Sequence, residues 1–242
     1  MSGSVSAFAD KMNEKAASLG CTHTHFANPN GLNNANHFTT AHDMALIANA
    51  AFNNATVRQV ASTLHYDFPA TASVPTVRTL TMGHKMLNPA NSQYYEGIIG
   101  GKTGYTPRAG HTLVTTASYN GLDLTAVTLN DGNMYLNQEE MYDYAFSNYE
   151  RITILDKDHF EVSDNYYQDK IYIKNSFQYP LTKEEQEEIT TLLSLTKKTK
   201  LKDGDEVGKV EVYLNDEKIH EEPVFVEIKK KRTFWDFLKD LF

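Results

Sequence analysis

The chain has 242 residues, which is enough for one large core or for a larger and a smaller domain. Its 31 acidic and 23 basic residues give a net charge of -8, and this excludes the basic footprint that nucleic-acid binding demands. Hydrophobic residues make up 40% and charged residues 22%, an ordinary globular usage that argues against a disordered or a membrane-embedded chain.

Two amphipathic helices are predicted in the first quarter of the chain. Apolar residues at helical spacing predict a helix over residues 5–19, and Gly20 follows where a helix C-terminus favours a left-handed residue. Residues 22–38 are rich in Asn, His and Gly and predict a structured loop. Thr40 to Asp43 resembles a capping box, with the carboxylate at the positive end of a second helix. The buried face of that helix should comprise Met44, Ala45, Ile47, Ala48, Ala51 and Phe52.

The middle of the chain predicts a sheet. Residues 57–64 favour a short helix, and residues 65–80 favour loops and short strands around two prolines. Turn-prone Pro107–Gly110 and Asn120–Gly121 then separate three strands. These strands form an antiparallel meander over residues 98–105, 111–118 and 122–129.

Another helix and a second domain follow the meander. Residues 138–149 predict an amphipathic helix whose apolar residues are Met141, Tyr144, Ala145 and Tyr149, so the fold class is α+β. Residues 151–228 are rich in Lys, Asp, Glu and β-branched residues, and their clearest hairpin joins Lys209–Leu214 to Val224–Val226. A small β-rich domain is therefore predicted after residue 150.

The last fourteen residues, 229–242, read as an amphipathic helix on a membrane surface. The basic cluster Lys229–Arg232 would meet anionic lipid. The residues of the apolar face are Phe234, Trp235, Phe237, Leu238, Leu241 and Phe242. The alternative is a helix that packs on the β-rich domain.

The N-terminal region carries no visible export signal. A basic stretch followed by an apolar core is missing, and no run approaches the roughly 18 apolar residues that a bilayer requires. The lone Cys21 excludes an internal disulfide and a thiolate zinc cluster. If the protein works outside the cell, we expect its signal upstream of Met1.

The tripeptide Lys102–Thr103–Gly104 is the strongest chemical signal, because it lies on the first strand of the meander. A lysine and a threonine hydroxyl together can hold a carboxylate by charge-assisted hydrogen bonds. A glycine removes the side chain that would block a ligand backbone. An exposed strand edge can also pair with an extended peptide. The sequence thus predicts a site for the C-terminus of a peptide.

Several ordered segments resemble the low-molecular-mass D-alanyl-D-alanine carboxypeptidases, a family of penicillin-binding proteins. They are residues 24–32, 37–48, 88–89, 95–106, 109–117 and 204–210. The resemblance implies a penicillin-binding, β-lactamase-like transpeptidase domain over residues 1–150, incomplete at its N-terminus. A β-rich domain over 151–228 and a membrane-surface helix over 229–242 would follow it.

The resemblance also implies an activity, serine-type D-Ala-D-Ala carboxypeptidation in peptidoglycan processing. A serine attacks the penultimate D-Ala carbonyl of the stem pentapeptide, D-alanine leaves, and water releases the acyl-enzyme. The implied partners are the stem peptide ending in D-Ala-D-Ala, β-lactams that trap the same serine in the full-length enzyme, and the membrane surface. No cofactor or metal is implied, and the implied location is the outer face of the cytoplasmic membrane.

Carried over from the family, Lys102 and Thr103 would bind the substrate carboxylate and Gly104 would admit the substrate backbone. The Tyr105 N–H would supply part of an oxyanion hole. A family arginine that assists carboxylate binding is not evident in residues 130–138, which leaves substrate preference open.

The family's nucleophile motif Ser-x-x-Lys and its Ser-x-Asn motif both belong upstream of the region that begins at Met1. We therefore expect no catalytic residue in this chain and an inactive polypeptide in isolation. Ser194–Lys197 and Ser163–Asn165 match these motifs formally, but both follow Lys102, which reverses the family order, and we assign them no role.

Two other interpretations remain. His23, His25, His37, His42 and Asp43 could be pictured as a zinc site. The favoured interpretation places His42 and Asp43 in a helix's first turn and the other histidines in a polar loop. Alternatively, the chain is a non-catalytic module that binds peptidoglycan or docks on a membrane, which would predict peptide binding without turnover.

Overall fold

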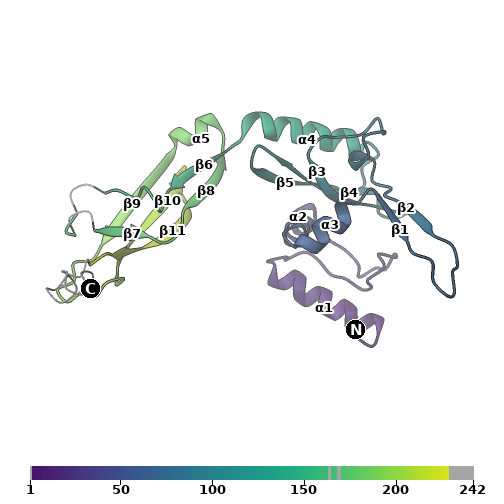
Figure 1. Cartoon of the computed structure of the whole chain (residues 1–242), viewed down its shortest axis with the longest axis horizontal. Helices are drawn as coiled ribbons and strands as arrows, with labels where there is room; N and C mark the ends of the chain where they lie inside the picture. The colour runs from purple at the N-terminus through teal and green to yellow at the C-terminus, as the bar shows by residue number, and fades with distance from the viewer. Residues whose placement is uncertain (1, 163–164, 168–169, 229–242) are drawn as a thin grey trace, which may run out of the picture. The chain divides into compact units, whose positions relative to one another are not determined.

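The computed structural model describes residues 2–162, 165–167 and 170–228, and the chain divides into two compact units (Figure 1). Unit 1 spans Met1–Ser147, and unit 2 begins at Asn148. Each unit has its own buried cluster. Unit 1 packs around Met86, Leu113, Ala117, Ala126 and Tyr142. Unit 2 packs around Leu155, Tyr167, Ile171, Ile173, Val207, Val210, Val212, Val224 and Val226.

Three helices open unit 1, as the apolar spacing predicts. They are α1 (Val5–Ser18), α2 (Ala41–Phe52) and α3 (Ala55–Ser62). Each begins at a polar N-cap: Ser4, Thr40 and Asn54 accept a backbone N–H from the first turn. Gly20 follows α1 with φ +85°, so the predicted left-handed residue is confirmed.

Only one of the two hydrogen bonds of the capping box predicted at Thr40 is formed. Thr40 accepts the Asp43 N–H at 3.1 Å, but the Asp43 carboxylate turns to the preceding loop. It accepts the His23 N–H and the Thr24 hydroxyl, both at 2.7 Å. An aspartate is one methylene shorter than the glutamate that usually closes such a box. Asp43 is therefore buried, and it ties residues 23–24 to α2.

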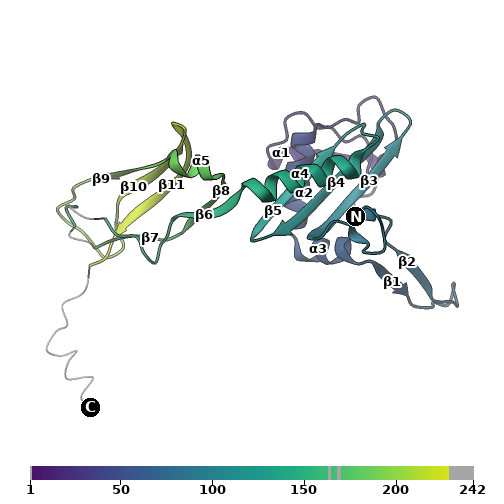
Figure 2. The same cartoon turned by 90° about the horizontal axis from the view of Figure 1, so that it is seen from above.

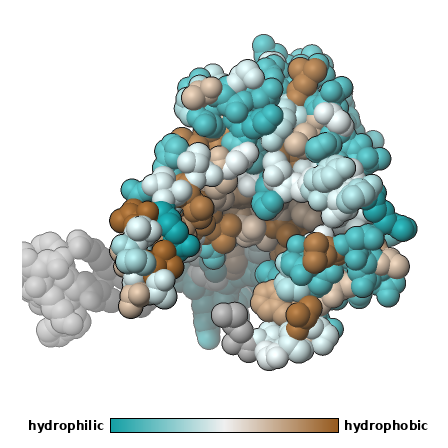
Figure 3. Space-filling view, turned by 90° about the vertical axis from the view of Figure 1, so that its right-hand side faces the viewer, coloured by the Kyte–Doolittle hydropathy of each residue, from teal (hydrophilic) through white to brown (hydrophobic). Residues whose placement is uncertain are grey.

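A hairpin and a short 3₁₀ helix connect α3 to the main sheet. Strands β1 (His65–Phe68) and β2 (Arg78–Thr81) pair antiparallel, and η1 covers Lys85–Leu87. Both hairpin strands are exposed along their whole length. Figure 3 shows unit 1 from this side, where hydrophobic residues lie at the surface among hydrophilic ones.

The predicted meander is confirmed. Strands β3 (Ile98–Thr106), β4 (Gly110–Tyr119) and β5 (Leu122–Thr128) pair in the order β3-β4-β5. Asn120 and Gly121 both have positive φ at the β4–β5 turn, as a two-residue hairpin requires. Helices α2 and α3 cover one face of this sheet, and α4 (Met134–Asn148) lies across the other (Figures 1 and 2).

Helix α4 packs on the sheet through polar groups. Gln138 is fully buried, and its amide nitrogen donates to the Leu113 carbonyl at 2.9 Å. Its amide oxygen and the Tyr142 hydroxyl both bond to the Thr115 hydroxyl. Burial raises the pKa of Tyr142 to about 12, so this phenol keeps its proton.

The apolar face predicted for this helix is wrong. Met141 is 46% and Tyr144 64% exposed, whereas Gln138 and Tyr142 face the sheet. Helix α4 also begins four residues earlier than residue 138, at Met134. The periodicity misled because the central buried residue is a glutamine, whose amide satisfies sheet groups that an apolar side chain would leave unpaired.

Unit 2 is β-rich. Its elements are β6 (Glu150–Leu155), β7 (Ile171–Ile173), β8 (Phe177–Leu181), α5 (Lys183–Glu187), β9 (Ile189–Leu195), β10 (Glu206–Leu214) and β11 (Glu217–Val226). One sheet has the order β7-β11-β10-β9, and β6 pairs with β8 in another. The predicted hairpin is β10–β11, with Asn215 and Asp216 at positive φ in its turn.

The predicted membrane-surface helix at 229–242 lies outside the described residues, as do Ser163 and Asp164 of one formal motif match. Among the helices that the structure does describe, none has the length and apolar content to cross a bilayer.

We expect Gln138→Ala to destabilise unit 1 by about 2–4 kcal/mol, because it leaves a cavity and buried acceptors without a donor. Amide hydrogen exchange of β4 and β5 measures this change. The control is Gln59→Ala on exposed α3, for which we expect less than about 0.5 kcal/mol. Equal effects of the two substitutions would contradict the structural role of Gln138.

Candidate functional site

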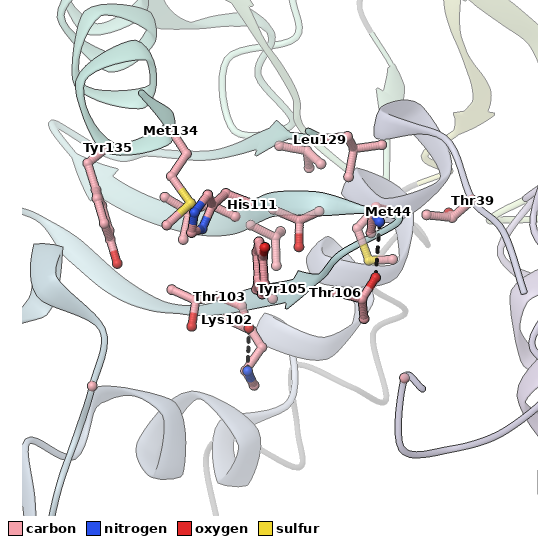
Figure 4. A pocket seen from close by; sticks show the side chains of 18 of the residues that line it. Thr39, Met44, Lys102, Thr103, Tyr105, Thr106, His111, Leu129, Met134 and Tyr135 are labelled. Carbon is pink, nitrogen blue, oxygen red and sulfur yellow. Dashed lines mark hydrogen bonds between the residues drawn. The ribbon is translucent and has the colours of Figure 1, made fainter. Parts of the chain in front are cut away.

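The predicted substrate-binding residues lie together on strand β3. Because β3 is an edge of its sheet, one side of its backbone faces away from β4. Lys102, Thr103, Gly104 and Tyr105 all line a cleft of about 850 Å³ (Figure 4). The other walls come from Pro29, Asn30, Gly31, Thr39, Met44, Gly83, Thr106, Ala109, His111, Met134 and Tyr135, with strand residues of β4 and β5.

Lys102 supplies the positive charge of this cleft. Its side chain is exposed, and Nζ donates to the carbonyl oxygen of Thr103. Within the described part of the chain, no carboxylate forms an ion pair with Lys102. Neighbouring side chains of a strand start on opposite faces, but at an edge strand Lys102 and Thr103 can both reach the free edge. The pair can therefore meet one anionic group there.

An aromatic wall adjoins this charge. Tyr105 is 63% exposed, and its ring lies 4.7 Å from that of His111, centroid to centroid. Met134 and Tyr135, at the start of α4, line the same cleft, and Met134 lies next to His111 in Figure 4. The cleft thus offers an ammonium and a hydroxyl next to flat apolar surfaces, a combination suited to an organic anion.

Two successive glycines let side chains press on β3 from both faces. A Cβ at Gly100 would lie 2.3 Å from Cε1 of Phe52 on α2. A Cβ at Gly101 would lie 2.4 Å from Nε2 of His84 and 2.6 Å from the Val114 carbonyl oxygen. Real Cβ contacts are never this short, so both positions require glycine. The strand that carries Lys102 is therefore clamped between Phe52 and His84.

His84 is a site residue that the sequence did not reveal. It is 3% exposed, and neither ring nitrogen has a hydrogen-bond partner among the described residues. Burial lowers the pKa of His84 to about 4, and the nearby charge of Lys102 acts in the same direction. The imidazole is therefore neutral at pH 7. A lone histidine carries no sequence signal of its own, but the glycine pair it packs on does.

The other candidate residues are not among those that line this cleft. Ser194 lies on β9 in unit 2, where it pairs with Lys209 of β10. Asp43 is bonded to residues 23–24, and the described residues contain no group of three or more His, Cys, Asp or Glu placed to hold a metal.

Gly101→Ala should destabilise unit 1 by about 1–3 kcal/mol, because the new methyl group overlaps a buried ring and a backbone oxygen. Gly132→Ala is the matched control, since nothing lies within 4 Å of its Cβ position. Amide hydrogen exchange of strands β3 and β4 in both variants gives the comparison, because it reports on unit 1 alone. If Gly101→Ala is as stable as Gly132→Ala, the clamp on β3 is wrong.

Two family models match the chain. The model of the D-alanyl-D-alanine carboxypeptidase family matches residues 1–133, and that of the C-terminal domain of penicillin-binding protein 5 matches residues 149–232. The chain is 29% identical to D-alanyl-D-alanine carboxypeptidase DacF of Bacillus subtilis over 260 residues, covering 99% of this chain and 63% of the relative. It is 33% identical to DacB2 of Mycobacterium tuberculosis, covering 57% and 47%.

A solved structure shares the fold. Penicillin-binding protein 5 from Haemophilus influenzae superposes with a TM-score of 0.68 at 24% identity, covering 93% of this chain and 66% of that one. The chain spans less than two thirds of the length of these relatives. Since a family model matches more than half of its residues, the chain belongs to the D-alanyl-D-alanine carboxypeptidase family of penicillin-binding proteins.

Proposed function

We propose that this chain carries the substrate-binding strand of a serine-type D-Ala-D-Ala carboxypeptidase that processes peptidoglycan. The observation that carries the proposal is the position of Lys102, an ammonium without a carboxylate partner in the described structure, on a free sheet edge within a cleft. Family membership supports the same activity. The ligand would be a stem peptide that ends in D-Ala-D-Ala.

Each residue of the strand has a role in this proposal. The Lys102 ammonium and the Thr103 hydroxyl bind the terminal carboxylate through charge-assisted hydrogen bonds. Gly104 bears no side chain where the peptide backbone would run along β3 as an added strand, and the Thr112 hydroxyl packs against the same position. The Tyr105 N–H donates to the oxygen of the scissile carbonyl, where negative charge develops during acylation.

The chemical step needs a nucleophile that this strand does not contain. In the proposal, the serine and its lysine come from residues outside this 242-residue chain, and β-lactams acylate that serine in the full-length enzyme. An extracytoplasmic location follows from the same proposal, because peptidoglycan lies outside the cytoplasmic membrane.

Lys102→Ala should weaken binding of a peptide ending in D-Ala-D-Ala roughly ten- to hundredfold, the cost of a charged hydrogen bond. Calorimetric titration of the 242-residue chain measures it, with exposed Lys183→Ala as the control. A peptide with an amidated C-terminus should bind no better to the wild type than to Lys102→Ala. Equal affinity of wild type and Lys102→Ala for the free acid would refute the role of Lys102.

Incubation with benzylpenicillin followed by intact-mass measurement tests the origin of the nucleophile. We expect no adduct on the folded 242-residue chain. A single stoichiometric adduct would place a working serine within these residues, and Ser163 and Ser194 would then become candidates. Binding of the D-Ala-D-Ala peptide without any adduct is also the outcome that a non-catalytic binding module would give.

We also propose that residues 229–242 attach the protein to the membrane surface, on the basis of their basic and apolar sequence pattern. The intact chain should float with liposomes that contain anionic lipid, and a chain ending at residue 228 should not. Equal flotation of the two chains would show that another region binds the membrane, or that the attachment does not exist.

A further inference from the structure

One wall of the cleft belongs to the loop between His25 and Phe38, whose two ends lie side by side and are called its neck here. Pro29, Asn30 and Gly31 line the cleft together with residues of β3. The loop begins and ends at the antiparallel bridge between His25 and Phe38, whose backbone bonds measure 2.9 and 3.0 Å. Whatever holds this neck closed therefore positions a wall of the cleft.

The outgoing side of the neck is fixed to α1. The side chain of Asn13 accepts the Phe26 N–H at 2.7 Å and donates to the Phe26 carbonyl at 3.0 Å. Such a paired contact makes Phe26 a firm anchor. The returning side, residues 34–37, has no comparable bond to α1 among those of the described structure, so it depends on contacts across the neck.

His37 makes a contact across the neck next to the wall, whose own turn is held by the bond from the Asn28 amide to the Leu32 carbonyl at 2.9 Å. Its Nδ1 accepts the Ala27 N–H at 3.2 Å, and its ring lies edge-on to Phe26 with centroids 5.6 Å apart. Because a backbone N–H can only donate, Nδ1 must carry no proton, and the neutral ring has its proton on Nε2. Protonation of His37 would place two N–H groups against each other.

The other histidine of the neck has the opposite requirement. Nδ1 of His25 bonds to the Asn36 carbonyl, which can only accept, so His25 keeps a proton on Nδ1 in either charge state. Of the two, only the bond of His37 is lost on protonation. Burial lowers the pKa of His37 below its usual 6.5, and the charge of His25 acts in the same direction.

The charged and titratable groups around this neck are few. His25 lies on the loop and His23 just before it. Helix α2 contributes Asp43, which is bonded to the His23 N–H and Thr24, and His42, whose ring bonds to Asp43. Helix α1 contributes the uncharged amide of Asn13 at the anchor, and its Lys11 and Lys15 line a pocket together with Phe26. His25 is the group whose charge acts on His37.

We propose that neutral His37 is a positioning residue for the cleft: by accepting the Ala27 N–H it closes the loop neck and holds Pro29–Gly31 against the site, and its protonation releases this wall. Its meaning for catalysis rests on the proposed function. The closure itself can be measured on this chain without substrate or turnover.

The pH dependence has a definite sign. A base whose pKa is lowered by folding contributes its full stabilisation above its unfolded value near 6.5. That stabilisation is lost as pH falls through the lower value of the folded state. The wall should therefore be held at pH 7.5 and loosened in acid.

Hydrogen exchange of the Ala27 amide, followed by NMR at pH 7.5 and 5.0 and expressed as a protection factor, tests the proposal. The wild type should lose protection roughly three- to tenfold in acid, the value of one hydrogen bond. His37→Asn offers an acceptor that does not titrate, so it should stay protected at both pH values. His37→Leu should be unprotected at both.

His25→Asn keeps a donor for the Asn36 carbonyl and removes the other titrating group, so its Ala27 amide should still lose protection in acid. Amides of β4 and β5 report whether any variant has unfolded as a whole. The proposal is overturned if His37→Asn loses protection in acid as the wild type does, or if the wild type shows no pH dependence. Failure of D-Ala-D-Ala binding with this pattern intact would refute only the proposed function.

Discussion

The site depends on the absence of two side chains. Gly100 and Gly101 allow Phe52 and His84 to approach opposite faces of β3 more closely than any Cβ would permit. Close packing on both faces fixes the height and twist of the strand, and therefore the place from which Lys102 leaves it. A side chain at either glycine would have to move the helix, the strand or both. The free edge of β3 is useful to a ligand only because its two faces are held in this way.

Much of the fold could be predicted because each element agrees with its local pattern. The order of the meander follows from its turn residues, and α1 and α2 follow from apolar spacing and N-caps. The buried face of α4 could not be predicted, because Gln138 is polar. Its burial is favourable only because its amide bonds to carbonyl and hydroxyl groups of the sheet, which the local sequence does not show. The hydrogen-bond partners of the Asp43 carboxylate could not be predicted either, since they lie about twenty residues earlier in the chain.

The residues of the candidate site also fall into two groups, those that a sequence motif reveals and those that only tertiary contacts reveal. Lys102 to Tyr105 are contiguous, so a motif reveals them together. His84 and His37 act through tertiary contacts with Gly101 and Ala27, and neither has a pattern around it that marks the contact. Both rings are neutral near pH 7 for a related reason, since burial disfavours their charged forms. Lys102 therefore supplies the positive charge of the cleft, while the imidazoles of His84 and His37 remain uncharged.

The two units of this chain each enclose a separate apolar cluster, one around Leu113 and Tyr142 and the other around Val210 and Val224. Cooperativity arises within a core, so the unfolding of one unit need not coincide with the unfolding of the other. A calorimetric scan should then contain overlapping transitions, and a single melting temperature would describe neither. Damage to the strand that carries Lys102 would go unnoticed in any whole-chain signal dominated by the β-rich unit.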